Sequence, residues 1–281
     1  MNRELLQSEL KESFAWMYRD KRKGKAYPLW KTLLFVFLYA AAFALLMHKF
    51  YMMGKALSAP LIQQDLEWLT FVLMGILSMM VVGLTNTFHA YMAIRRLKEE
   101  ESLPEGIKAI TNMLCAKFCG SYIMGLFYSL VFMIPGVLVH LQLTQPNLLG
   151  FIFTLCVPLL LGFLSLILSC LLAYVVFVIS SRISNKNMLT VLLSVLFLAG
   201  YYILYEKSQD IFQAVLNSAA DVALWIQRFA HPFYQLGLGV QGNTLSVVTF
   251  CITVFLAVAI AGCLLWMLYR RALVKRKTLQ N

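Results

Sequence analysis

The chain has 281 residues, 60% of them hydrophobic, and its mean hydropathy is +0.74. Soluble globular domains are nearer roughly 45–50% apolar, so the composition excludes an ordinary soluble domain and predicts a membrane protein. The net charge of +11 would suit a nucleic-acid partner, but the basic residues gather beside apolar segments, so we predict membrane lipids as partners and no nucleic acid.

Residues 1–28 precede the first long apolar run and are predicted to form an amphipathic helix followed by a basic arm. Leu6, Leu10 and Phe14 fall near one helical face. The run "RDKRKGK" after them suits anionic lipid headgroups at the membrane interface. A solvated basic arm is the alternative. We expect no cleavable signal peptide, because these residues are charged and lack an uninterrupted apolar core.

Residues 29–281 are expected to form one all-α, polytopic membrane domain with six transmembrane helices. Each of six apolar stretches is long enough to cross a hydrocarbon core of about 30 Å. Pro135 and Pro158 are natural kink points in the third and fourth stretches, which exceed the required length. The six predicted spans cover residues 30–50, 69–93, 112–140, 148–180, 187–205 and 245–269.

Connections rich in lysine and arginine alternate along the chain with connections poor in these residues. Eighteen of the 24 lie before the first span, between the second and third, between the fourth and fifth, or after the sixth, and Lys31 and Lys117 lie at the adjoining starts of the first and third spans, which makes twenty. Because cytoplasmic loops carry an excess of these residues, both termini are predicted to be cytoplasmic.

Polar residues within the second predicted span are candidates for function, since they are costly in a membrane unless paired or used. The stretch "GLTNTFHAY" places Asn86 and His89 three residues apart. Hydrogen bonding between helices and a role in a substrate pathway or gate are both open; a metal site is not predicted. Lys117 is expected to extend its amine towards the cytoplasm, and His140 is expected to be hydrated at the outer end of its span.

The connection before the third span reads "RRLKEEESLPEGIKAI" and is densely charged. Six of its first seven residues carry charge. Ser102 and Glu105 fit a capping box with Pro104 in the first turn, so a helix is predicted to begin near Leu103.

This predicted helix, within residues 95–114, carries an apolar stripe at Leu103, Ile107 and Ile110 and leads directly into the third span. An amphipathic helix on the cytoplasmic side is suited to docking in a groove of a soluble protein. The residues predicted to make this contact are Arg95, Arg96, Ser102, Leu103, Pro104, Glu105, Ile107 and Ile110.

Small residues open the third span, in the stretch "AKFCGSYIMG". Ala116 with Gly120, and Ser121 with Gly125, are pairs of small residues four apart. Such pairs permit close helix approach. Whether the partner helix belongs to this chain or to another subunit stays open at this point.

Residues 208–240 precede the last span and are moderately apolar with helical spacing. We predict one or two short helices that dip into the outer leaflet and break at His231 and Pro232. Trp225 and Phe229 are placed to act as interfacial aromatic residues.

The sequence contains no recognisable catalytic motif. The sequence lacks the phosphate-binding GxxxxGK[ST] loop, the HExxH zinc motif and the GxSxG elbow. The six cysteines lie in or beside apolar spans without a CxxC pair and are interpreted as small buried hydrophobes; a metal pair at Cys115 and Cys119 is the alternative. An intramembrane hydrolase using the glutamates of "KEEES" is a further, less favoured alternative.

These features together resemble the ABC-2 type transmembrane domain, the permease part of type V ABC exporters. The resemblance covers nearly the whole chain and depends on architecture more than on particular residues. The stretch "SLPEGIKAITNMLCAKF" is similar to the family's "LP-x-n-K" signature, with Pro104 and Lys117 at the matching positions and a longer spacing than the commonest form. The segment "HPFYQLGLG" is similar to the Pro-then-Gly segment before the family's last span.

The resemblance implies a multi-pass permease of the bacterial plasma membrane without an ATPase site or cofactor of its own. A separate ATPase dimer, which holds ATP and Mg, would bind around residues 95–114 and drive export of a peptide, lipid, glycan or antibiotic. A second permease half, identical, different or fused, would complete the pathway. A non-transporting six-span scaffold or sensor is the main alternative, and a secondary transporter or channel is another.

Overall fold

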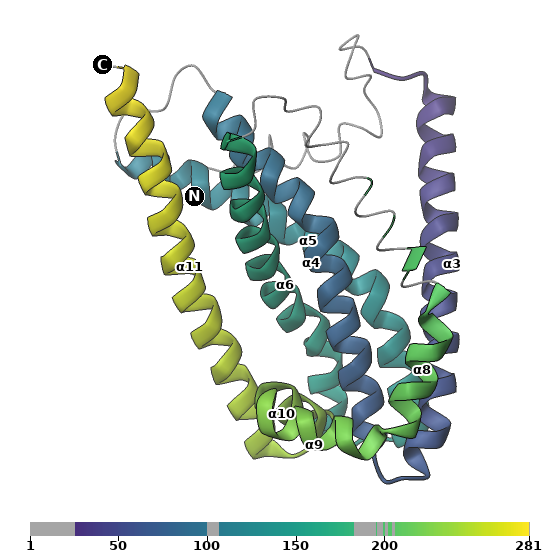
Figure 1. The fold of residues 1–281 in the computed structure, drawn as a ribbon. Helices are drawn as coiled ribbons and strands as arrows, with labels where there is room; N and C mark the ends of the chain where they lie inside the picture. Colours follow the sequence, from purple (N-terminus) through teal and green to yellow (C-terminus); the bar gives the residue numbers. More distant parts are fainter. Residues whose placement is uncertain are drawn as a thin grey trace.

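A computed structural model describes residues 26–99, 107–182 and 206–280, together with residues 195, 199, 202 and 203. Helices make up the fold of this part of the chain (Figure 1). Their bounds are α3 (Leu29–Ile62), α4 (Glu67–Glu99), α5 (Ile107–Thr144), α6 (Leu148–Arg182), α8 (Ser208–Asn217), α9 (Ala219–Phe229), α10 (His231–Val240) and α11 (Thr244–Gln280).

Five of these helices contain stretches long and apolar enough to cross a membrane: α3, α4, α5, α6 and α11. The predicted class, a helical membrane protein, is confirmed to that extent. The span predicted at 187–205 lies almost entirely outside the described residues, as does the predicted amphipathic helix in residues 1–28.

The five long helices lie alongside one another as a bundle with two distinct ends (Figure 1). The start of α3 and the end of α11 lie at one end, which we call the terminal end. The connections from α3 to α4 and from α5 to α6 lie at the other, with α9 and α10; we call this the hairpin end. The charge pattern predicts that the terminal end is cytoplasmic.

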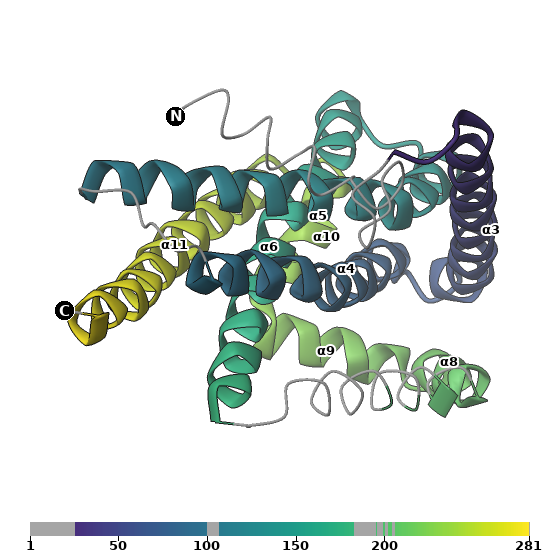
Figure 2. The ribbon, with the colours of Figure 1, turned by 90° about the horizontal axis from the view of Figure 1, so that it is seen from above.

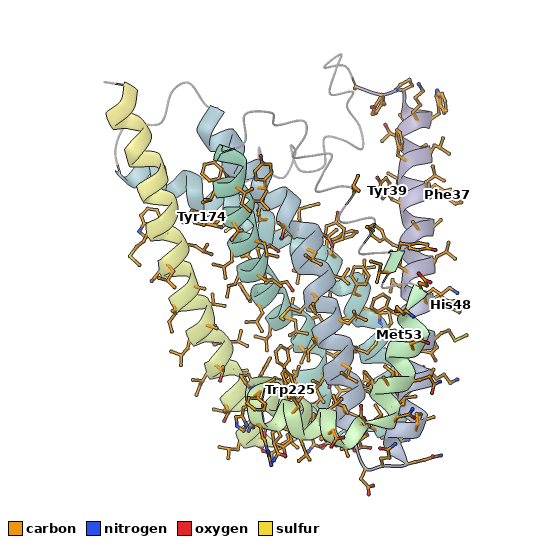
Figure 3. All side chains as sticks on the ribbon, viewed as in Figure 1. Phe37, Tyr39, His48, Met53, Tyr174 and Trp225 are labelled. Carbon is orange, nitrogen blue, oxygen red and sulfur yellow. The ribbon has the colours of Figure 1, made fainter. Side chains whose placement is uncertain are left out.

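α4, α5 and α6 form the centre of the bundle, because each of them packs against the other two. α3 and α11 lie at the edges. Within the most apolar 18 residues of α3 none is buried, and few are in α11. α3 meets α5 through aromatic contacts such as Phe50 with Phe132, whose ring centroids are 4.9 Å apart. Figure 3 shows Tyr39 on the bundle side of α3 and Phe37 on its outer side.

The hydrophobic core is concentrated at the hairpin end. One large cluster joins the hairpin-end portions of the long helices to α9 and α10, and Phe71, Leu69, Leu161, Leu236 and Phe250 are among its fully buried members. The second cluster lies nearer the terminal end and is small. Its buried members are Ala90, Cys170, Ala173 and Leu265. Among the side chains that the structure describes, the larger cluster therefore lies where the hairpins meet.

α10 approaches its neighbours closely because of two glycines. A Cβ atom on Gly237 would lie 2.6 Å from the Trp68 ring of α4, and one on Gly239 would lie 2.6 Å from the Phe153 ring of α6. Neither position has room for a side chain without movement of these rings. The predicted break before Pro232 is confirmed: α9 ends at Phe229, Ala230 separates the two helices, and α10 begins at His231 with proline in its first turn.

Asn147 fixes two helix ends at once. Its Oδ1 accepts a 2.8 Å hydrogen bond from the Gly150 backbone N–H, which caps the start of α6. Its Nδ2 donates a 3.4 Å hydrogen bond to the backbone oxygen of Gly242, in the turn between α10 and α11. Gly242 has φ +95°, a conformation that favours glycine, and a Cβ there would overlap the Asn147 amide.

α5 and α6 are continuous helices through Pro135 and Pro158. The Ser129 hydroxyl of α5 donates a 3.0 Å hydrogen bond to the Pro158 backbone oxygen. This contact connects α5 to α6 at the backbone of Pro158.

Candidate functional site

The predicted docking segment lies between α4 and α5 at the terminal end. Arg95 and Arg96 are on the last turns of α4, and Ile107 and Ile110 are on the first turns of α5. The remaining members of the predicted contact lie outside the described residues: Ser102, Leu103, Pro104 and Glu105. A helix start near Leu103 therefore stays a prediction, and the described part of α5 begins at Ile107.

The helices on either side of this connection continue beyond the predicted spans. α4 stays helical through residues 95–99, four of which are charged, and α5 is helical from Ile107. At about 1.5 Å per residue, residues 94–99 extend α4 by about 9 Å beyond the predicted span 69–93, and residues 107–111 extend α5 by about 8 Å beyond the predicted span 112–140. α5 is strongly tilted, and its first turns reach towards the side of α11 (Figures 1 and 2).

Asn86, the first candidate for a pathway or gate, lies at the contact between α4 and α5. Its side chain is fully buried. Its Nδ2 donates a 2.9 Å hydrogen bond to the Ser121 backbone oxygen, and its Oδ1 has no hydrogen-bond partner in the described structure. Asn86 therefore forms an interhelical hydrogen bond, which was one of the two interpretations of this residue.

The small residues of α5 make this contact possible. A Cβ atom on Gly125 would lie 2.9 Å from the Asn86 Nδ2, so only glycine leaves the amide its present position. Ala116 and Ser121 are buried on the same helix. The helix that packs against the Ser121 and Gly125 pair is therefore α4 of the same chain.

Two other expectations for this region have different outcomes. The side chain of His89 lies outside the described part of the structure, so its pairing with Asn86 stays a prediction. Lys117 was expected to extend towards the cytoplasm, but the residue is buried, with 7% of its surface exposed. Packing of α5 against its neighbours, which the sequence does not reveal, encloses the lysine.

Hydroxyl groups connect α4 to α6 along the same half of the bundle. The Ser169 Oγ donates a 2.9 Å hydrogen bond to the Gly83 backbone oxygen of α4. A Cβ on Gly83 would lie 2.6 Å from a methyl carbon of Leu168, so the two helices approach closely at this point. Small residues combined with side-chain hydrogen bonds are typical of helix contacts inside membranes.

A second polar cluster, at the hairpin end, was missed at the sequence level. His140 was expected to be hydrated, but it is buried, with 5% of its surface exposed. Its Nε2 lies 3.3 Å from the Val240 backbone oxygen and 3.3 Å from the Thr144 Oγ1. Nearby, the Gln241 Nε2 donates a 2.8 Å hydrogen bond to the Glu67 Oε1.

The only local signal for this cluster is the four-residue spacing of His140 and Thr144. The other contacts join residues about 100 and 174 positions apart in the chain. Such pairings depend on how α10 docks, so no periodicity in the sequence indicates them.

The described residues contain no group of three or more His, Cys, Asp or Glu side chains that could hold a metal ion. All six cysteines have free thiols. Among the described residues, the polar groups that connect helices include amides, hydroxyls, the His140 imidazole and the Glu67 carboxylate.

Comparison with known proteins assigns no family to this chain. No family model matches it, and no curated protein or solved structure matches it either.

Proposed function

We propose that this chain is the transmembrane permease subunit of an ATP-driven ABC-2 type exporter of the bacterial plasma membrane. A separate ATPase subunit, which binds ATP and Mg, supplies the energy. A second permease half completes the pathway, and the substrate is an amphipathic peptide, lipid, glycan or antibiotic.

The observation that carries this proposal is the projection of helices at the terminal end. Residues 94–99 and 107–111 continue as helix beyond the predicted spans 69–93 and 112–140. The charged connection lies between these two projections. A rigid pair of helices at that place transmits movement of a docked partner into the centre of the bundle, because α4 and α5 are both central helices.

The packing of the hairpin end supports the same proposal. A large hydrophobic cluster holds that end together. A transporter that alternates between two states needs one end that is closed and another that moves at low cost. In the proposed mechanism, this structure corresponds to a state closed at the hairpin end.

The test is purification of the tagged chain from the cells that produce it, with identification of bound proteins by mass spectrometry and measurement of MgATP hydrolysis. Ile107→Asp places a charge on the predicted apolar docking stripe. Leu148→Asp is the matched control, because Leu148 is 76% exposed at the start of α6, at the opposite end of the bundle.

We expect an ATPase to co-purify equally with the unsubstituted chain and with Leu148→Asp, and at least about tenfold less with Ile107→Asp, since one buried charge in an apolar contact costs several kcal/mol. Absence of any ATPase from the unsubstituted preparation contradicts the exporter proposal. An undiminished ATPase in Ile107→Asp contradicts the docking position alone.

A further inference from the structure

A small cavity of about 10 Å³ lies at the hairpin end, between α3, α4 and α5. On this measure a volume of about 10–15 Å³ is enough for one water molecule. Its lining is mixed. Met74, Phe71 and Val139 are among the apolar members, and the polar side chains around it are Ser58, Glu67, Thr70, His140 and Thr144.

Thr70 is the lining residue that indicates what this cavity binds. It is 6% exposed, and its Oγ1 has no hydrogen-bond partner within the described structure. A buried hydroxyl without a partner costs about 1–3 kcal/mol. A hydroxyl that lines a water-sized space avoids this cost if a water molecule occupies the space.

The neighbouring groups offer the further partners that a buried water requires. The Nε2 of His140 lies within reach of two oxygen acceptors, on Val240 and Thr144, so its hydrogen is on Nε2. The Thr144 hydroxyl donates to the His140 backbone oxygen at 2.8 Å. In this tautomer the Nδ1 of His140 is a hydrogen-bond acceptor, as is the Glu67 carboxylate.

We propose that this cavity is a binding site for a single water molecule, which hydrogen-bonds to Thr70 and completes a polar latch at the hairpin end. The latch consists of the Glu67–Gln241 and His140–Val240 hydrogen bonds, which hold the end of α10 against α4 and α5. The water adds the Thr70 hydroxyl of α4 to this set of contacts. The inference concerns the fold itself and does not depend on the proposed function.

The test compares two substitutions that each remove a buried hydroxyl of α4, one beside the cavity and one away from it. Thr70→Val replaces the hydroxyl with a methyl group of nearly the same size. Ser78→Ala is the control: Ser78 Oγ is also buried on α4 without a partner, but Ser78 does not line the cavity. The apparent Tm of each purified full-length protein is measured in the same detergent at one scan rate, since membrane proteins often unfold irreversibly.

If the cavity is hydrated, Thr70→Val removes a hydrogen bond to the water and the apparent Tm falls by about 2–4 °C. Ser78→Ala, which removes an unpartnered hydroxyl, leaves the apparent Tm unchanged or raises it. If Thr70→Val also leaves it unchanged or raises it, the cavity is dry and the proposal is wrong.

An experimental structure provides an independent test. At a resolution where ordered waters are visible, we expect a density peak within about 3.2 Å of the Thr70 Oγ1 and its loss in Thr70→Val. An empty cavity in the unsubstituted protein at that resolution overturns the proposal.

Discussion

The side-chain amide of Asn86 in α4 donates a 2.9 Å hydrogen bond to the backbone oxygen of Ser121 in α5. A carbonyl oxygen has two lone pairs, so this bond adds to the hydrogen bonding within α5 and does not replace it. It joins the two central helices within the predicted spans, about two helical turns before the charged residues at the end of α4. The loss of stability when Asn86 is replaced therefore measures how strongly this hydrogen bond holds α4 and α5 together.

Asn86→Ala should destabilise the protein by about 1 kcal/mol, the usual size of an interhelical hydrogen bond in a membrane. The measurement is the apparent Tm in detergent. Thr85→Ala is the control, since the Thr85 hydroxyl bonds to the Val81 backbone oxygen within α4. Equal effects of the two substitutions would show that the Asn86–Ser121 bond contributes nothing to stability.

Gly125→Ala should cost about 1–3 kcal/mol, because the added Cβ would lie 2.9 Å from the Asn86 amide and force it to move. Gly262→Ala in α11 is the matched control: its Cβ would meet nothing within 4 Å. There the higher helix propensity of alanine should stabilise by up to about 1 kcal/mol.

The double variant Asn86→Ala, Gly125→Ala distinguishes a local clash from general damage. We expect it to be less destabilised than the sum of the single variants, since alanine at 86 removes the group that the new Cβ meets. Strict additivity in thermal unfolding measurements would argue against the contact.

The charge pattern predicts that the hairpin end faces outwards. In a background in which the six cysteines are replaced by serine or alanine, Gln63→Cys in the α3–α4 connection should react with a membrane-impermeant maleimide on intact spheroplasts. Lys277→Cys near the end of α11 should react only after the membrane is opened. The reverse labelling pattern would invert the predicted topology.

Trp225 should lie at the membrane interface. Its side chain is 57% exposed at the hairpin end, beside Phe229, with ring centroids 5.9 Å apart (Figure 3). In vesicles, a variant that keeps only this tryptophan should be quenched more by lipids brominated near the headgroup than by lipids brominated at the chain end.

The control for this measurement keeps only Trp68, which is 7% exposed and packs against Tyr234. Its fluorescence should be quenched weakly by both lipids. Quenching of Trp225 no stronger than that of Trp68 would place Trp225 away from lipid.

Local patterns in the sequence were sufficient to predict that the chain folds as a helical membrane protein. The apolar runs predicted α3, α4, α5, α6 and α11 at nearly the right places, because length and hydropathy decide whether a helix is stable in lipid. The helical spacing and Pro232 likewise predicted short helices in residues 208–240. The structure has three of them, since α10 forms its own helix after the break.

The polar contacts were only partly predictable. Asn86 was identified as a candidate because an amide inside a membrane requires a hydrogen-bond partner. The position of Asn86 in the sequence does not indicate which helix supplies that partner. His140 was misjudged, since its burial depends on the docking of α10, whose close approach relies on Gly237 and Gly239. Packing between distant segments leaves no periodic signal in the chain.

The hydrogen bond between Glu67 and Gln241 has a consequence for biogenesis. The two residues are 174 positions apart, so at roughly 5–20 residues per second the ribosome makes Gln241 about 9–35 s after Glu67. During that interval the faces of α4 and α6 that Gly237 and Gly239 later cover, around Trp68 and Phe153, have no α10 to pack against. Closure of the hairpin end is therefore a late event in assembly, and truncation before α10 leaves the nascent bundle open on that side.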